Sequence, residues 1–333
     1  MDRLSGRRRR LVFGGLVAHV AAAALAIGCG STAGPGSTPV TPTVLTPPPI
    51  TPTTETLVAA GDIALCEHLT GAQQTARLLD AIPGTVAALG DLAYMQGSEQ
   101  NFRECYTPTW GRHRNRTYPV PGNHEYETPG AAAYFAYFGS QAGMPGRGYH
   151  SFRLGAWLVL ALDSNVAVGA GSPQYEWLRS ELQANASTCA VAYAHHPLFS
   201  SGPNGGSDRV RAVWELMYQH GVDLYLAGHD HLYDRQAPQD PSGRQDPVRG
   251  IREFVVGTGG GPLYQVVRPT ASSEARHSGW GVLKLTLAET SYSWEFVPVE
   301  GGSFRDSGSG TCHLTQAPVE LPAFGPRPLT PGP

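Results

Sequence analysis

Positive charge is scarce in this 333-residue chain, whose only lysine is Lys284. Charged residues make up 15% of the sequence, and five of the arginines lie within residues 1–28, where the only acidic residue is Asp2. Removing that segment changes the net charge from −3 to −7. Proteins that bind nucleic acid gather lysine and arginine on one surface. The composition therefore argues against nucleic-acid binding as the main role, and no nucleic-acid-binding surface is expected.

Long apolar runs are also few, and the mean hydropathy of −0.22 excludes a protein with many membrane-spanning helices. The apolar run Leu11–Ile27 has 17 residues, whereas a membrane-spanning helix needs about 20. It follows the consecutive arginines Arg7–Arg10 and precedes small residues. A basic segment, a short apolar segment and small residues are typical of an export signal. We therefore expect residues 1–29 to direct the protein out of the cytoplasm.

Two interpretations of Cys29 stay open. Residues Ala26–Cys29 resemble a bacterial lipobox, although leucine is usual at the position of Ala26. In this interpretation Cys29 is lipidated, becomes the new N-terminus and anchors the protein to a bacterial membrane. In the other, an ordinary signal peptide is cleaved and Cys29 has no role. Residues Arg9–Phe13 also loosely resemble a twin-arginine signal, which would export the protein already folded.

Proline-rich segments flank the part of the chain that can fold. Residues 31–54 contain seven prolines and eight threonines, which cannot bury apolar surface, so residues 30–55 are predicted to be an extended linker. Residues 313–333 contain six prolines and are predicted to be a disordered tail. Residues 56–312 remain for a single folded domain.

Apolar runs alternate with helical patterns in this domain. Strands are expected at Thr56–Ala60, Thr85–Leu89, Thr117–Val120, Trp157–Leu162, Cys189–Ala194, Val222–Ala227, Ile251–Val256, Val282–Leu287 and Ser291–Val297. Helices are expected at Ala72–Ala81, Ala131–Phe138, Gln174–Asn185 and Asp208–His220. Alternating elements followed by consecutive strands predict an α/β fold with mixed sheets. In such folds the functional loops follow the carboxyl ends of strands.

Five of the predicted strands are followed by side chains that can bind a metal. The segments are Gly61-Asp62, Gly90-Asp91, Asn123-His124-Glu125, His195-His196 and His229-Asp230-His231. Any one of them is explained by an ordinary turn, because glycine and aspartate both favour turns. Five in one domain indicate a metal site instead. His229 and His231 are two residues apart, so in an extended segment both side chains point to the same side.

These segments resemble the motifs of the calcineurin-like metallophosphoesterase superfamily over residues 57–300. The runs Gly90–Tyr94 and Gly228–Arg235 are similar to the purple acid phosphatase branch, with Asp234 where that branch has glutamate. The resemblance implies a four-layer α/β/β/α sandwich with two mixed β-sheets and a single catalytic domain. Two features depart from the pattern. Ala64 stands where glycine is usual, and there is no histidine about ten residues after His195, where some plant members have one that contacts substrate.

The resemblance implies a dinuclear metal centre with seven ligands. Metal 1 would be held by Asp62, Asp91, Tyr94 and His231, and metal 2 by Asp91, Asn123, His195 and His229, with Asp91 bridging both. His196 competes with His195 for the ligand role, but the spacing to Pro197 favours His195. The expected catalytic residues are Asp91 and His124, of which His124 would donate a proton from outside the coordination shell.

The ligand chemistry favours Fe(III) paired with a divalent Zn, Fe or Mn ion. Carboxylates and a phenolate suit a trivalent ion, whereas an amide and imidazoles suit a divalent one. Ionised Asp62, Asp91 and Tyr94 would supply three negative charges, so that these two metals and one hydroxide leave a positive site that attracts phosphate. Two divalent metals are the alternative, because the assignment of iron depends on Tyr94 alone.

A metal-dependent hydrolase of phosphoric esters is the implied function, with a phosphomonoesterase of acid phosphatase type expected. A metal-bound hydroxide would attack phosphorus while His124 protonates the departing oxygen. The implied partners are small phosphate esters. The alternatives are a phosphodiesterase or nucleotidase on the same centre, and a non-catalytic surface protein that uses this fold to bind a partner.

The cysteines other than Cys29 suit an oxidising compartment, and four of them allow three pairings. We favour Cys66–Cys105, which would join the loops that carry Asp62 and Asp91, together with Cys189–Cys312.

Several further residues are expected near the site. Asp163 would support it, Ser200–Ser207 would shape the substrate cleft, Gly257–Gly261 would form a tight turn beside it, and Trp110 and Tyr126 would line the cleft.

Overall fold

The computed structural model describes residues 54–144 and 146–314, and no helix in these ranges is long and apolar enough to cross a membrane. Strands and helices run from Glu55 to Thr311. The predicted export signal with Cys29 lies outside the described residues, as do most of the predicted linker and tail.

Fifteen strands lie in the described ranges. They are β1 (Glu55–Ala60), β2 (Ala64–Leu65), β3 (Thr85–Leu89), β4 (Ala93–Tyr94), β5 (Thr117–Val120), β6 (His150–Leu154), β7 (Trp157–Ala161), β8 (Ala190–Tyr193), β9 (Leu224–Ala227), β10 (Tyr233–Gln236), β11 (Arg252–Val256), β12 (Ser273–His277), β13 (Gly281–Leu287), β14 (Ser291–Pro298) and β15 (Ser307–Thr311). They form a six-stranded sheet in the order β15-β14-β13-β1-β3-β5, a seven-stranded sheet in the order β12-β10-β11-β9-β8-β7-β6, and the small pair β2-β4. Both large sheets contain parallel and antiparallel pairs.

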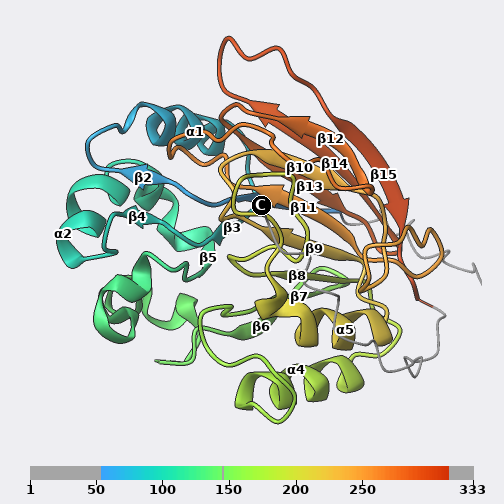
Figure 1. The fold of residues 1–333 in the computed structure, drawn as a ribbon. Helices are drawn as coiled ribbons and strands as arrows, with labels where there is room; N and C mark the ends of the chain where they lie inside the picture. The colour runs from blue at the N-terminus through green and yellow to red at the C-terminus, as the bar shows by residue number, and fades with distance from the viewer. Residues whose placement is uncertain (1–53, 145, 315–333) are drawn as a thin grey trace, which may run out of the picture. The chain divides into compact units, whose positions relative to one another are not determined.

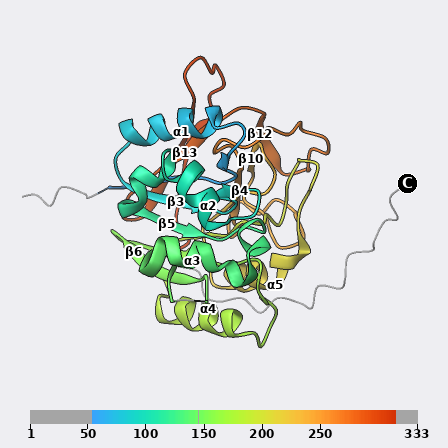
Figure 2. The same ribbon diagram turned by 90° about the vertical axis from the view of Figure 1, so that its left-hand side faces the viewer.

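The helices in the same ranges are α1 (Thr70–Ala81), α2 (Glu99–Asn101), α3 (Ala132–Phe138), α4 (Pro173–Ala184) and α5 (Arg211–Gln219). Helix α4 begins one residue before the predicted Gln174, because the Ser172 hydroxyl accepts a hydrogen bond from the backbone of Tyr175 and Pro173 occupies the first turn. Helix α1 lies on one side of the two large sheets, and α4 and α5 lie on the other (Figures 1 and 2). The layers therefore follow the expected α/β/β/α order.

Strand β7 shows why the central strands are apolar throughout. Every residue from Trp157 to Ala161 is buried, and alternate side chains enter different cores. Val159 packs with residues of the six-stranded sheet, whereas Leu158 and Leu160 pack with residues of α4 and α5. Successive side chains of a strand point to opposite faces, so a strand covered on both faces needs an unbroken apolar run.

The expected strands and helices are present, with ends shifted by a few residues. Two features differ from the sequence prediction. The segment 208–220 begins with a 3-10 turn at Asp208–Val210, and only Arg211–Gln219 is α-helical. Strands β10, β12 and β15 were not expected, because their sequences are polar and hydrogen bonds to neighbouring strands hold them in place. Strands β2, β4 and β6 also lie outside the predicted runs.

Both favoured disulfide pairings are confirmed. The Cα atoms of Cys66 and Cys105 lie 5.2 Å apart, and those of Cys189 and Cys312 lie 5.4 Å apart. The first bond joins the segment after β2 to the segment after α2, close to the loops that follow β1 and β3. The second ties the start of β8 to the end of β15. Each bond closes a long stretch of chain and stabilises the folded state, because it restricts the conformations of the unfolded chain.

Candidate metal centre

The candidate ligands follow the carboxyl ends of five strands. In the six-stranded sheet, β1 leads to Asp62, β3 to Asp91 and β5 to the segment with Asn123. In the seven-stranded sheet, β8 leads to His195 and β9 to the segment from His229. Strands β1, β3 and β5 are parallel neighbours, as are β8 and β9, so each group ends at one edge of its sheet. Two loop clusters thereby meet in one site.

Three residues of the site have backbone conformations that residues other than glycine rarely adopt. Asp62, Asp91 and His229 have φ angles of 59°, 51° and 71°. Non-glycine residues in this left-handed region are uncommon and cost stability, so the surrounding structure must enforce them. Each conformation turns the chain sharply after its strand and directs the side chain into the cluster.

The proposed ligands of metal 1 converge on a small volume. The Tyr94 hydroxyl oxygen lies 3.0 Å from Asp62 Oδ1, 3.3 Å from Asp91 Oδ2 and 3.1 Å from His231 Nε2. His231 Nε2 lies 3.2 Å from Asp62 Oδ1. Four donor atoms from three segments of the chain thus face one point, and the two carboxylates and the phenol are completely or almost completely buried.

The proposed ligands of metal 2 lie next to this group. His195 Nε2 lies 3.1 Å from Asn123 Oδ1, 3.3 Å from Asp91 Oδ2 and 3.3 Å from His229 Nδ1. Asp91 Oδ2 therefore belongs to both groups. Donor atoms of Asp62, Asp91 and His195 all lie within 4.8 Å of one another, which is close enough for a shared cation.

Hydrogen bonds from the backbone fix which atom each ligand presents. Asp62 Oδ2 accepts from the His229 N–H at 2.9 Å, and Asp91 Oδ1 accepts from the His124 N–H at 2.9 Å, so each carboxylate keeps one oxygen for the cluster. The Nδ1 atom of His195 lies 2.9 Å from the carbonyl oxygen of Leu89, which leaves Nε2 facing inward. Such outer contacts orient metal ligands in proteins.

The charges in the cluster fit a cation. Burial disfavours ionisation of Asp91, but His195 outweighs burial and lowers the pKa of Asp91 below its usual range. Burial likewise disfavours the charged form of His195, yet Asp91 raises the pKa of His195 to about 10. Burial, with the charges of Asp62 and Asp91, raises the pKa of Tyr94 well above its usual value. Within the described residues, the ion-pair partners of Asp62 and Asp91 are all histidines, so the buried carboxylates and imidazoles suit a metal that replaces their protons.

Glu125 supports the Asp91 loop, a role that the sequence did not reveal. Its buried carboxylate accepts hydrogen bonds from the backbone N–H groups of Gly122, Asp91 and Leu92 at 2.7, 2.9 and 2.8 Å. Burial and the nearby charge of Asp91 raise the pKa of Glu125 to about 7. The sequence feature that could have pointed to Glu125 is its position directly after Asn123 and His124. That position does not show that the carboxylate accepts hydrogen bonds from backbone groups.

His124 lies beside the cluster without joining either ligand group. Its Nδ1 atom is 2.5 Å from the carbonyl oxygen of Met95, and its Nε2 atom is 3.8 Å from Asp91 Oδ2. The ring meets the Tyr94 ring edge-on, with centroids 4.6 Å apart. The side chain keeps 23% of its surface exposed, whereas Asp91 keeps 3%, so His124 borders the solvent-facing side of the site.

His196 points away from the ligand position that the sequence left open to it. Its Nδ1 atom lies 2.7 Å from the Ser164 hydroxyl, and its ring packs 4.5 Å from the His229 ring. Asp163, which was expected to support the site, accepts hydrogen bonds with its carboxylate from the Tyr126 hydroxyl and the Asn165 backbone at 2.6 and 2.9 Å.

The expectation that Trp110 lines the cleft is wrong. Trp110 is completely buried, and its indole N–H donates to the Thr75 hydroxyl of α1 at 2.9 Å. Its apolar ring belongs to the hydrophobic core, where burial is more favourable than exposure. Tyr126 is half-buried, and its hydroxyl donates a hydrogen bond to the Asp163 carboxylate.

Two further loops lie against the ligands. The segment Gly257–Gly261 forms the expected turn, with the Gly259 and Gly261 N–H groups donating to the carbonyl oxygens of Gly61 and Asp62 at 2.8 and 2.7 Å. The loop Ser200–Ser207 is held by Asp230, which accepts from the backbone of Asn204 at 3.0 Å, and the Asn204 amide donates to the carbonyl oxygen of His229 at 2.9 Å.

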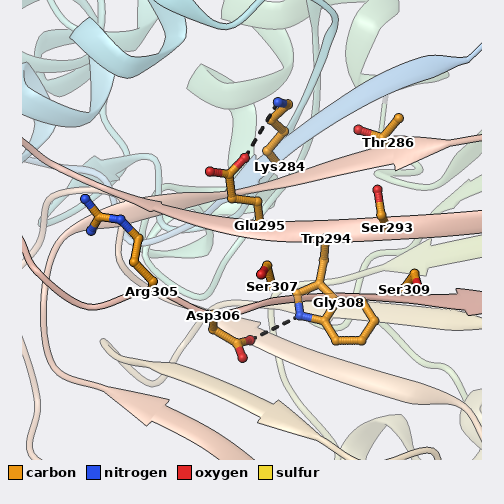
Figure 3. A pocket seen from close by; sticks show the side chains of 10 residues that line it. All are labelled: Lys284, Thr286, Ser293, Trp294, Glu295, Arg305, Asp306, Ser307, Gly308 and Ser309. Carbon is orange, nitrogen blue, oxygen red and sulfur yellow. Dashed lines mark hydrogen bonds and ion pairs between the residues drawn. The ribbon is translucent and has the colours of Figure 1, made fainter.

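A separate cavity of about 660 Å³ lies over β13, β14 and β15 (Figure 3). Its lining contains hydroxyl groups, the Lys284–Glu295 ion pair and the Asp306–Trp294 hydrogen bond, but none of the seven candidate ligands. The cavity is therefore distinct from the ligand cluster.

Comparison with known proteins identifies the family. The family model for calcineurin-like phosphoesterases matches residues 56–233, which is more than half of the chain. The chain belongs to the calcineurin-like phosphoesterase family. Purple acid phosphatase 15 of Arabidopsis thaliana is 26% identical over 216 residues, covering 54% of this chain and 40% of that protein. An uncharacterized protein of Mycobacterium tuberculosis is 30% identical over 218 residues, covering 51% of this chain and 41% of that protein.

This calcineurin-like phosphoesterase also shares its fold with solved structures. Purple acid phosphatase PPD1 from yellow lupin seeds superposes with a TM-score of 0.64 at 19% identity, covering 82% of this chain and 58% of that one. GAP50, the anchor in the inner membrane complex of Plasmodium, superposes with a TM-score of 0.62 at 14% identity, covering 82% of this chain and 99% of that one. At these identities the likeness shows the fold alone. The relatives that are purple acid phosphatases place the chain in the purple acid phosphatase-like branch. The chain spans less than half the length of the two relatives named above.

Proposed function

We propose that this protein is a metal-dependent hydrolase of phosphoric esters that acts on phosphomonoesters in the manner of an acid phosphatase. The observation that carries the proposal is the position of Asp91 Oδ2, which lies 3.3 Å from both the Tyr94 hydroxyl oxygen and His195 Nε2. One carboxylate oxygen between two groups of donors is what a bridging ligand of two metals requires. A surface protein that no longer needed metal would have no reason to keep all seven donors.

The two donor groups differ in chemistry, and this supports two different ions. Metal 1 would be held by Asp62, Asp91, Tyr94 and His231, and metal 2 by Asp91, Asn123, His195 and His229. Anionic oxygen donors in the first group favour Fe(III), and the amide and imidazoles of the second favour a divalent ion such as Zn, Fe or Mn. When bound, such a pair polarises phosphoryl oxygens and makes a coordinated water more acidic.

His124 is the proposed proton donor to the departing oxygen of the ester. Its Nδ1 N–H is directed at the Met95 carbonyl oxygen, so Nε2 is the atom that faces the cluster. A proton held at Nε2 can pass to an alkoxide that forms beside the ligands, as general acid catalysis requires. Asp91 Oδ2 lies 3.8 Å from this Nε2 atom, which places the proposed donor next to the bridging ligand.

Metal content and the visible absorption spectrum of the purified protein test the metal assignment. We expect about two metals per chain, one of them iron, because two donor groups share Asp91. A phenolate bound to Fe(III) gives a purple colour, so Tyr94→Phe should abolish the colour while wild-type protein keeps it. Two divalent metals without colour would overturn the assignment of iron. A protein that binds no metal after reconstitution would overturn the proposed function.

A pair of substrates tests the reaction. p-Nitrophenyl phosphate should be hydrolysed faster than bis(p-nitrophenyl) phosphate, with highest activity at mildly acid pH because Fe(III) acidifies water more than a divalent ion does. The opposite preference would assign the site to a phosphodiesterase. A maximum well above neutral pH would contradict the presence of Fe(III).

We also propose that the protein works outside the cytoplasm. The two disulfides support this location, because such bonds persist in oxidising compartments. Fractionation of cells that express the full chain should place it in the cell envelope, and Cys29→Ser should release it from the membrane fraction if Cys29 carries a lipid. Recovery of wild-type protein from the cytoplasm would contradict the export signal.

A further inference from the structure

The guanidinium group of Arg209, near the ligand cluster, has no carboxylate partner among the residues that the structure describes. Arg209 lies in the 3-10 turn Asp208–Val210, directly after the loop Ser200–Ser207, and its side chain is exposed. No carboxylate of the described ranges lies within ion-pair distance of it, and the adjacent Asp208 is already paired with Arg211, whose Nε atom lies 3.0 Å from Asp208 Oδ1. In the described part of the chain, its one hydrogen bond runs from Nη1 to the carbonyl oxygen of Ser164 at 3.3 Å.

Ser164 places this guanidinium on the side of the site proposed for metal 2. The residue follows β7, which is the neighbour of β8 in the sheet. Its hydroxyl oxygen lies 2.7 Å from His196 Nδ1, and the His196 ring packs against the ring of His229. The next residue, Asn165, donates to the carbonyl oxygen of Pro121 at 2.9 Å, at the start of the segment that carries Asn123.

The charge of Arg209 acts on Asp163, the residue before Ser164, because it opposes the increase that burial causes in the pKa of the Asp163 carboxyl. The hydrogen bond to Ser164 holds one N–H group, and the other N–H groups of the guanidinium have no acceptor within residues 54–144 and 146–314. A guanidinium in this state matches the geometry of a phosphate, with which it forms two parallel charged hydrogen bonds.

We propose that Arg209 binds a second phosphate group of the substrate while the first lies at the metal centre. The enzyme then favours small esters that carry two phosphates over otherwise similar monophosphates. This inference rests on the proposed phosphoesterase function and adds a substrate class to it. In an acidic body with one lysine, an unpaired arginine beside the site is well placed to select for substrate charge.

The test compares fructose 6-phosphate with fructose 1,6-bisphosphate, which present the same ester with and without a second phosphate. Arg209→Ala should raise KM for the bisphosphate about fivefold, the effect of one solvent-accessible charge pair, and leave KM for the monophosphate about unchanged. Arg209→Lys should restore part of the loss, because it keeps the charge without the fork. The matched control is Arg77→Ala, which removes an exposed arginine of α1 on the far side of the sheets.

Equilibrium binding gives a second readout. In metal-loaded His124→Ala protein, calorimetry should show the same selective, about fivefold loss of bisphosphate affinity when Arg209→Ala is added. Equal losses for both sugars would mean that Arg209 only supports the loop, and unchanged affinities would mean that it does not touch substrate. Either result overturns the inference while wild-type turnover of p-nitrophenyl phosphate still supports the phosphatase. Wild-type protein inert toward every phosphate ester would overturn both.

Discussion

The carboxylate of Glu125 accepts a hydrogen bond of 2.9 Å from the backbone N–H of Asp91, the residue shared by the two donor groups. The neighbouring N–H of Leu92 donates to the same carboxylate at 2.8 Å. A φ angle of 51° at Asp91 is unfavourable for a residue with a side chain, so this contact holds a strained turn in place. The geometry of the metal site thus depends on a buried residue that is not itself a ligand.

Glu125→Gln should weaken both the fold and the metal site. The amide would turn an N–H group toward backbone N–H groups, which leaves a buried donor unsatisfied and costs about 1–3 kcal/mol in the free energy of unfolding. Metal affinity should fall about tenfold or more, as for other residues that orient ligands. Urea unfolding and titration against a chelator measure the two effects. Glu127→Gln, at an exposed position two residues later, is the control, and a wild-type metal affinity in Glu125→Gln would refute the supporting role.

His124→Ala should lose turnover but keep metal. Removal of a general acid lowers kcat about 10²–10⁴-fold for substrates whose leaving group needs a proton, such as alkyl phosphates. The loss should be smaller for p-nitrophenyl phosphate, because p-nitrophenolate departs without protonation. Metal analysis and kcat on both substrates give the result, with exposed His68→Ala as the control. A variant that loses metal would show that His124 is a ligand and not a proton donor.

Gly90→Ala should disturb the second donor group. Gly90 has a φ of 83°, and a Cβ atom there would lie 2.7 Å from His195 Nδ1 and 2.8 Å from the Gly122 nitrogen. Gly130→Ala is a matched control, since its φ is 63° but nothing lies within 4 Å of the added carbon. Both variants carry the left-handed backbone cost of about 1–2 kcal/mol. Only Gly90→Ala should also lower metal content, and equal metal content in both variants would contradict the predicted collision.

Asp223 should make the protein less stable as the pH rises from acid to neutral. Its buried carboxylate accepts from the backbone of Ala190 at 2.8 Å and of His313 at 2.7 Å, and burial raises its pKa to about 7. The unfolded chain has an aspartate pKa of about 3.9. Between these values the native state binds a proton that the unfolded state does not, so this contribution is full below about pH 4 and is lost as the pH rises through about 7.

Asp223→Asn removes this titration and tests it. The asparagine keeps one acceptor oxygen, so the variant should be less stable than wild type at about pH 5, and the difference should shrink at about pH 8. His313 Nδ1 lies 3.2 Å from Asp223 Oδ1, so the substitution also changes the surroundings of this histidine, and the comparison measures the titration of the pair. Urea unfolding at the two pH values measures the difference, and a difference independent of pH would contradict the assignment.

Much of the candidate site was predictable because its signals are local. Glycine before Asp62 and Asp91 marks sharp turns after apolar strands, and the two-residue spacing of His229 and His231 places both side chains on one side of the chain. The structure brings these side chains together as the sequence pattern implies. Strands such as β7 were predictable for a similar reason, since burial on both faces requires an unbroken apolar run.

By itself the sequence determined which residues could meet at strand ends, because alternation and turn formation act over only a few residues. The tertiary structure alone decided what each side chain touches. It turned Glu125 onto the Asp91 loop, buried Trp110 in the hydrophobic core and set Arg209 against Ser164, 45 residues away along the chain. Polar strands such as β10 and β12 likewise depend on partners distant in sequence. Such contacts are fixed by the packing of whole sheets, which no short segment encodes.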